Sequence, residues 1–96
     1  MKLLLAIYSG SQPRLVPELF DRHGAGGWTE LPPAHGVGTT GRREGTRAWP
    51  GDARLYLSMV PKEQADALVE ALRAGSNQLQ PGERLHVGVL PMETFF

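Results

Sequence analysis

The chain has 96 residues, with ten basic and ten acidic side chains and no net charge, which predicts one domain over residues 1–96 and argues against a nucleic-acid binder. It has no cysteine, which excludes a disulfide, a thiolate metal site and a cysteine nucleophile. The apolar start is too short for a signal peptide or a membrane span, so we expect a cytoplasmic protein with no membrane insertion.

The first third of the chain is predicted to form a strand, a helix and a second strand. The apolar run at residues 2–8 is typical of a central strand that is buried on both faces or at an interface. Pro17 is tolerated only in the first turn of a helix, so the helix should begin a few residues before it, or else kink, and Gly24 should end it. The second strand covers roughly residues 28–35, and its two adjacent prolines place it at an edge or a bulge.

The remaining two thirds are predicted to form a long loop, a strand, a second helix and a last strand. Residues 36–52 hold more glycines than a short turn needs and are predicted to be a loop. Residues 53–60 alternate in polarity, as a strand does. Pro61 should open the second helix and Gly75 should end it, and residues 84–90 form the last strand. The apolar residues on one face of the 53–60 strand are Leu55, Leu57 and Met59.

This order of elements, β-α-β-loop-β-α-β, predicts a ferredoxin-like βαββαβ fold of the α+β class. In that arrangement four strands form an antiparallel sheet and both helices cover one of its faces. The other face of the sheet carries apolar residues and needs a cover. In so small a chain, a second subunit is the cover that requires the fewest additional residues.

Residues 36–51 are the most unusual stretch, and we interpret them as a ligand-responsive loop. Gly36, Gly38, Thr39 and Thr40 would wrap a phosphate with backbone amides and hydroxyls. The alternative interpretation is that the glycines only allow the chain to bend out of a strand. A G-x-G pattern alone does not decide between the two.

The same loop also contains arginines, which are typical of a segment that binds an anion or a protein partner. Arg42, Arg43 and Arg47 would steer an anion or pair with a partner, although solvated charges are common in such loops. Trp49 would stack on a base, anchor a protein contact or hold the loop against the rest of the domain. The loop is therefore the predicted partner-binding segment.

Several segments, taken in order, resemble the nitrogen-regulatory PII protein superfamily over nearly the whole chain. The run Ala34-His35-Gly36-Val37-Gly38 is similar to the entry into the long T-loop of that family, and the other similar segments are residues 1–7, 19–24 followed by 28–30, 65–72 and 87–93. Members of the superfamily are ferredoxin-fold trimers that bind adenine nucleotides between subunits. They regulate a protein partner by docking the T-loop on it.

The resemblance implies a trimeric signalling protein that is not an enzyme, with ATP, ADP or AMP as its expected ligand. It assigns ligand binding to Gly36, Val37, Gly38, Thr39 and Thr40 at the loop entry, and to Gly82 and Arg84 at the last strand. Arg84 would meet a phosphate from the neighbouring subunit, unless it is only an exposed charge at the end of a strand.

The chain also departs from the family pattern. Its T-loop is short and lacks the tyrosine-bearing tip, and Thr39-Thr40 replaces the glutamine that follows the second glycine. The nucleotide loop before the last strand is matched loosely by Gly75 and residues 81–84, and the C-terminal arginine-bearing segment is missing. These departures predict a divergent member and leave open which ligand, if any, it binds.

Two other hypotheses remain at this stage. His35 and His86 lie on different predicted strands. If these strands are neighbours, the two histidines would bind a metal ion together with acidic side chains, although no tight spacing such as H-x-x-x-H is present. The other hypothesis is a small ferredoxin-like enzyme with histidine acid–base chemistry. No G-x-S-x-G motif or other nucleophile–base spacing supports catalysis.

Overall fold

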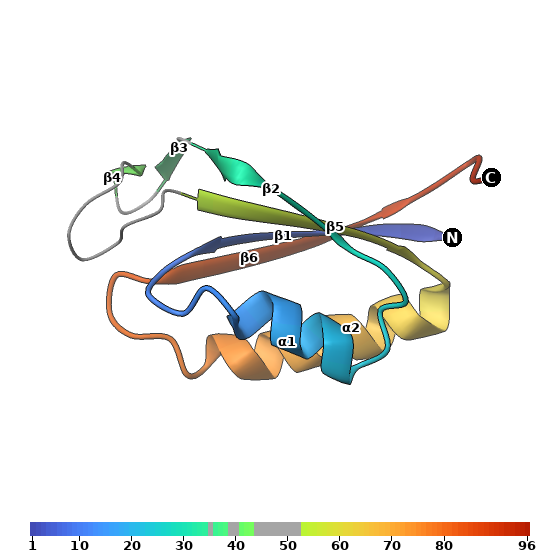
Figure 1. Ribbon diagram of the computed structural model, residues 1–96, viewed down its shortest axis with the longest axis horizontal. Coiled ribbons are helices and arrows are strands. Elements are labelled where there is room, and N and C mark those ends of the chain that lie inside the picture. Colours follow the sequence, from blue (N-terminus) through green and yellow to red (C-terminus); the bar gives the residue numbers. More distant parts are fainter. Residues whose placement is uncertain (35, 39–40, 44–52) are drawn as a thin grey trace.

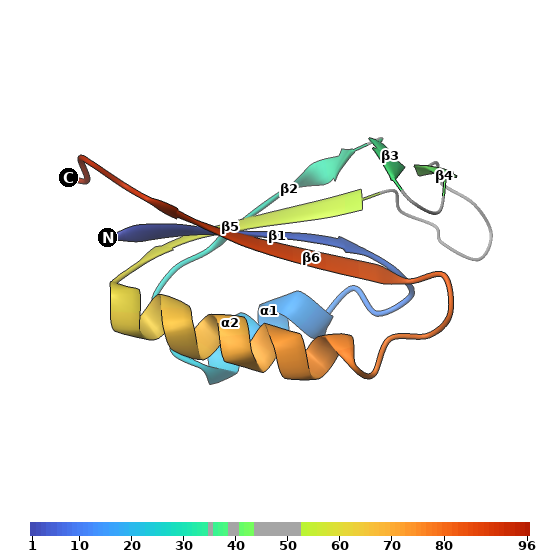
Figure 2. The ribbon, with the colours of Figure 1, turned by 180° about the vertical axis from the view of Figure 1, so that it is seen from behind.

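Four strands form one antiparallel sheet in the computed structural model, which describes residues 1–34, 36–38, 41–43 and 53–96. Along the chain they are β1 (Lys2–Ser9), β2 (Thr29–Ala34), β5 (Ala53–Val60) and β6 (Arg84–Pro91), and across the sheet their order is β2-β5-β1-β6. The helices α1 (Leu15–Arg22) and α2 (Lys62–Ser76) cover one face (Figure 1, Figure 2). The predicted ferredoxin-like α+β fold is confirmed, and neither helix is long and apolar enough to cross a membrane.

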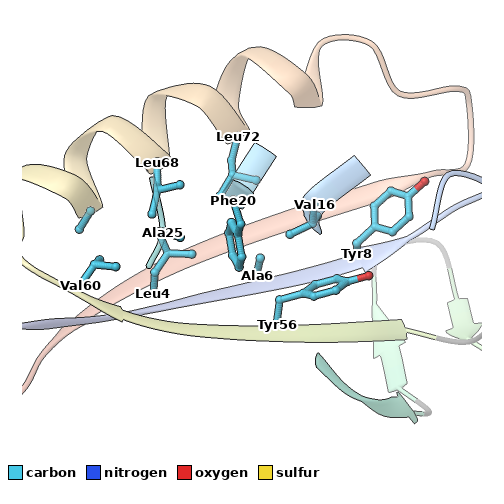
Figure 3. Close-up of a cluster of buried hydrophobic side chains, with 11 residues drawn as sticks. Leu4, Ala6, Tyr8, Val16, Phe20, Ala25, Tyr56, Val60, Leu68 and Leu72 are labelled. Carbon is cyan, nitrogen blue, oxygen red and sulfur yellow. The ribbon is translucent and has the colours of Figure 1, made fainter. Parts of the chain in front are cut away.

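The core lies between the helices and the sheet, and alternation along the strands selects its residues. On β1, Leu4, Ala6 and Tyr8 are fully buried beneath the helices (Figure 3). Phe20 and Tyr56 meet edge to face with ring centroids 6.3 Å apart, a favoured geometry for aromatic pairs. The other buried residues of the cluster are Val16, Ala25, Val60, Ala65, Leu68 and Leu72.

The opposite face of the sheet has no helix over it. The predicted stripe of β5 lies on this face, because its partners on β1 are the residues between the buried ones: Leu5 pairs with Leu57 and Leu3 with Met59. Leu3 also pairs with Leu90 on β6, and Met59 and Leu90 are 47% and 50% exposed. The prediction that β1 is a central strand is therefore confirmed. Within one copy of the chain, however, only its helix-facing side is fully buried.

The helix boundaries predicted from prolines agree with the structure better than those predicted from glycines. Pro17 is the third residue of α1, in its first turn, and Gly24 follows the helix at a φ of 77°, as predicted for a C-terminal stop. The prediction that Gly75 ends the second helix is wrong, because α2 continues to Ser76. A Cβ at Gly75 would lie 3.0 Å from Leu19 Cδ1, so this glycine allows α2 to pack closely on α1.

The segment after β2 contains more regular structure than the sequence predicted. β2 is an edge strand, and its register with β5 shifts between Leu31 and Ala34, where the two prolines lie. The prediction of one continuous loop from residue 36 is wrong, because β3 (Gly36–Gly38) and β4 (Gly41–Arg43) form an antiparallel hairpin. His35, Thr39, Thr40 and residues 44–52 lie outside the described residues.

Candidate functional site

The loop between α2 and β6, residues 77–83, contains the predicted residue Gly82 and leads into Arg84. At its end the Glu83 amide donates to the Gln80 carbonyl at 3.0 Å. Pro81 and Gly82 occupy the two central positions of this turn, and Gly82 has a φ of 88°. A type II turn prefers this pair, because proline presets the first position and glycine accepts the positive φ of the second. Gly82 is therefore required by the turn itself.

Glu83 is the residue that fixes this loop to the rest of the protein. It is 2% exposed, and its carboxylate accepts three hydrogen bonds. Oε2 accepts from the Ser11 amide at 2.7 Å and from the Ser11 hydroxyl at 2.8 Å, and Oε1 accepts from the Gln80 amide at 2.8 Å. Burial raises the pKa of the Glu83 carboxyl, but these hydrogen bonds outweigh burial and hold the pKa below its ordinary value. Glu83 is therefore a buried anion with partners in two loops.

The second of these loops, residues 10–14, joins β1 to α1, and Tyr8 fixes it by a hydrogen bond. The Gln12 amide donates to the Tyr8 hydroxyl at 2.8 Å. Burial raises the pKa of Tyr8, and the nearby Glu83 charge adds to that effect. A Cβ at Gly10 would lie against the Tyr8 hydroxyl and 2.7 Å from Glu83 Oε2. Glycine is thus needed at position 10 because the backbone passes close to both polar groups.

Beside this turn lies an open surface pocket of about 460 Å³, within the size range of small-molecule sites. Its wall combines apolar side chains with polar groups. Arg84, partly exposed, belongs to the wall, and its Nη1 donates to the Glu83 carbonyl at 2.9 Å. The lining residues are Ser76, Leu79, Gln80, Pro81, Glu83, Arg84 and Leu85.

The structure does not bring the two halves of the predicted ligand site together within one subunit. Gly36, Val37 and Gly38 form β3, beyond the end of β2, whereas Gly82 and Arg84 lie at the start of β6. β2 and β6 are the two edge strands of the sheet, so roughly 14 Å of strand spacing separates them. Both halves lie at the same end of the sheet in both views (Figure 1, Figure 2). The predicted ligand residues therefore fall into two groups on opposite edges of the sheet, which we call the two half-sites.

The remaining predicted residues divide between described and undescribed segments. Arg42 and Arg43 lie in β4, while Arg47 and Trp49 lie outside the described residues. His86 is exposed on β6, where it pairs with Ile7 on the uncovered face. Its proposed metal partner, His35, is not described. Within the described ranges, no three histidine, aspartate or glutamate side chains are arranged to hold a metal ion.

Polar side chains on β5 form a further feature that the sequence analysis did not predict. Arg54 pairs with Glu30 on β2 at 3.1 Å. The Tyr56 hydroxyl is buried beneath the helices and has no hydrogen-bond partner among the described residues. Burial and the Glu30 charge raise the pKa of Tyr56 to about 12, against the opposing effect of the Arg54 charge. Neither Tyr56 nor Glu83 belongs to a sequence motif, and only their packing reveals them.

No protein-family model and no curated protein sequence matches the chain. Solved structures do resemble it. One is CPII, a nitrogen regulatory PII-like protein from Thiomonas intermedia K12, bound to ADP, AMP and bicarbonate, with a TM-score of 0.72 and 23% identity over 93% of this chain and 84% of that chain. CPII bound to ADP and bicarbonate gives a TM-score of 0.67 and 26% identity over the same shares of the two chains.

A PII-like signaling protein from Thermus thermophilus is similar as well. Its TM-score is 0.64 and its identity 25%, over 92% of this chain and 83% of that chain. These likenesses extend over almost the whole of the fold described above. Together with the ordered sequence segments, they show that the chain is similar to PII-like proteins in its fold.

Proposed function

We propose that this PII-like protein is a non-enzymatic regulator that binds a small anionic ligand, most simply an adenine nucleotide, between the subunits of a homotrimer. Residues 36–51 would then contact a protein partner, with an affinity that depends on the bound ligand. The solved PII-like structures hold ADP, AMP and bicarbonate, which are anions of this class.

The observation that carries the proposal is the position of the two half-sites. The β3 entry and the start of β6 lie at one end of the sheet but on opposite edges. One ligand can contact both only where the β2 edge of one copy approaches the β6 edge of the next. A head-to-tail contact of this kind closes into a ring when the rotation between copies allows it.

The uncovered face of the sheet supports assembly. Leu3 lies between Met59 and Leu90, so an apolar surface continues across three neighbouring strands. Large exposed apolar surfaces usually mark interaction sites. Packing this face against the same face of other copies would also supply the second cover that so small a core needs.

The test is calorimetric titration of metal-stripped protein with ATP, ADP and AMP, each with and without zinc. We expect saturable nucleotide binding, and Arg84→Ala should weaken it about tenfold or more, because a charge-assisted hydrogen bond contributes roughly 1.5–3 kcal/mol. Arg22→Ala is the control, since Arg22 is an exposed arginine in the last turn of α1 and does not line this pocket.

Three results would count against the proposal. Equal loss of affinity in the Arg84 and Arg22 variants would mean that the effect is one of general charge. Heat from zinc alone would favour the metal-binding alternative at His35 and His86. If no nucleotide gives a heat of binding, the protein does not bind an adenine nucleotide. Residues 36–51 would then bind a protein partner without a ligand.

A further inference from the structure

One carboxylate holds together two loops that are far apart in the sequence. Glu83 accepts from Ser11, which is 72 residues away, and from Gln80 within its own turn. The first loop follows β1 and the second precedes β6, and these two strands are paired, Ser9 with Arg84. The carboxylate therefore lies where the two loops leave adjacent strands. We call Glu83, Ser11 and Gln80 the carboxylate anchor.

The carboxylate anchor requires more specific partners than apolar packing would. A buried carboxylate is tolerated only when hydrogen bonds replace its lost hydration. Here three donors supply them, and position 10 must be a glycine to leave room for Oε2. A packed apolar side chain would join the loops without these requirements. The donors fix direction as well as proximity, because each hydrogen bond limits the orientation of one loop.

The anchor also controls the wall of the pocket. Gln80, Glu83 and Arg84 all belong to that wall. The Glu83 side chain is buried, while Arg84 remains partly exposed at the pocket and donates to the Glu83 carbonyl. A shift of the Glu83 backbone would therefore move Arg84 with it.

We infer that Glu83 is a positioning residue for the ligand half-site on β6. Its carboxylate joins the α2–β6 loop to the β1–α1 loop and thereby holds Arg84 and the Gly82 turn in one arrangement before a ligand arrives. This inference rests on the proposed function, since it assigns the ligand to the same pocket. Preorganisation of this kind raises affinity because less ordering remains to be done on binding.

The isosteric change Glu83→Gln tests the anchor directly. All of its partners are donors, so the amide group of glutamine must face either Ser11 or Gln80 with a donor against a donor. The hydrogen bonding to one of these two residues should therefore be lost, while the size and shape of the side chain are kept. Glu63→Gln is the matched control, because it makes the same chemical change at an exposed position in the first turn of α2.

The first measurement is amide hydrogen exchange of the ligand-free variants. We expect Glu83→Gln to speed exchange at least tenfold in both loops, including the amides of Ser11 and Gln80, because the anchor holds each loop through the other. Tyr8→Phe removes the acceptor of the Gln12 amide and should speed exchange in the β1–α1 loop alone. If Glu83→Gln leaves either loop unchanged, the anchor does not couple them and the inference fails.

The second measurement is the affinity of each variant for ADP. Glu83→Gln should lose about tenfold or more in affinity, whereas Glu63→Gln should equal the wild type. Val60→Ala is the control for general destabilisation, because Val60 is buried in the core at the opposite end of the sheet (Figure 3). It should lower stability without changing ADP affinity.

These arms separate the inference from the proposed function. Faster exchange in both loops with unchanged ADP affinity would reduce Glu83 to a structural role and overturn the inference. An affinity loss in Val60→Ala equal to that in Glu83→Gln would overturn it too. If the wild type binds no adenine nucleotide, the proposed function fails, while the exchange arm still decides whether Glu83 couples the loops.

Discussion

Glu83 and Arg84 are neighbours in the sequence but have opposite surroundings. Arg84 was predicted to be a ligand residue because the chain resembles the PII family and because an arginine after a glycine-containing turn suits an anion. Glu83 was not predicted, because its meaning depends on Ser11, 72 residues away. A single acidic residue in a polar loop looks like any solvated charge. Its burial, with hydrogen bonds to two loops, becomes visible only in the folded chain.

Tyr56 predicts how stability changes in alkaline solution. Its folded pKa is about 12, above the ordinary 10.0, so the folded state favours the neutral phenol. The resulting stabilisation is fully present below pH 10 and is lost as pH rises towards 12. The difference between these two pKa values corresponds to roughly 2–3 kcal/mol of the free energy of unfolding. Urea unfolding between about pH 9 and 12 should show a steeper loss in wild type than in Tyr56→Phe, and equal slopes would contradict this account.

At the scale of elements, the periodic segments could be predicted and the glycine-rich ones could not. The strand predicted at residues 53–60 coincides with β5, and the helix predicted after Pro61 coincides with α2 up to its last turn. Alternation, however, did not show which face of β5 was the core. Leu55, Leu57 and Met59 form the more apolar stripe, yet Tyr56, Ser58 and Val60 are buried, because the helices pack on their side.

Two predictions that rested on glycines were wrong, one about the end of a helix and one about a loop. Gly75 was predicted to end a helix but allows two helices to pack closely. The glycines from residue 36 onward predicted an open loop, although Gly36–Gly38 and Gly41–Arg43 pair as a hairpin. Glycine permits many conformations, so its presence alone does not select one.

The β1–α1 loop gives a prediction for Gly10→Ala. The added Cβ would press on the Tyr8 hydroxyl and on Glu83 Oε2 at 2.7 Å. We expect a loss of about 1–3 kcal/mol in the free energy of unfolding, the usual effect of overpacking. Gly26→Ala is the control, because nothing lies within 4 Å of its added Cβ. Urea denaturation measures both, and equal stabilities would show that Gly10 is not constrained by the two polar groups.

At the scale of the whole molecule, the sequence predicted the residues of both half-sites but not the separation between them. The residues of β3 and the start of β6 were assigned to one ligand on the basis of family resemblance. Which strands form the edges of the sheet depends on long-range pairing, which local patterns do not encode. In the structure the two half-sites lie on opposite edges of the sheet. Whether they bind one ligand therefore depends on how neighbouring subunits are arranged.

The uncovered face gives a prediction for assembly. Met59→Lys places a charge on the apolar surface that Met59 forms with Leu3 and Leu90. We expect the variant to sediment as a monomer with a folded circular dichroism spectrum, because a buried unpaired charge opposes association. Ala67→Lys makes a comparable change at an exposed position of α2 and should assemble like the wild type. Unchanged assembly of Met59→Lys would place the subunit interface elsewhere.

The most direct test of the central claim is an experimental structure of the assembled protein with ADP. The account predicts that each nucleotide lies between two copies, in contact with Arg84 of one copy and with the β3 backbone of the next. ADP bound entirely within one subunit, or at a surface remote from both edge strands, would contradict it.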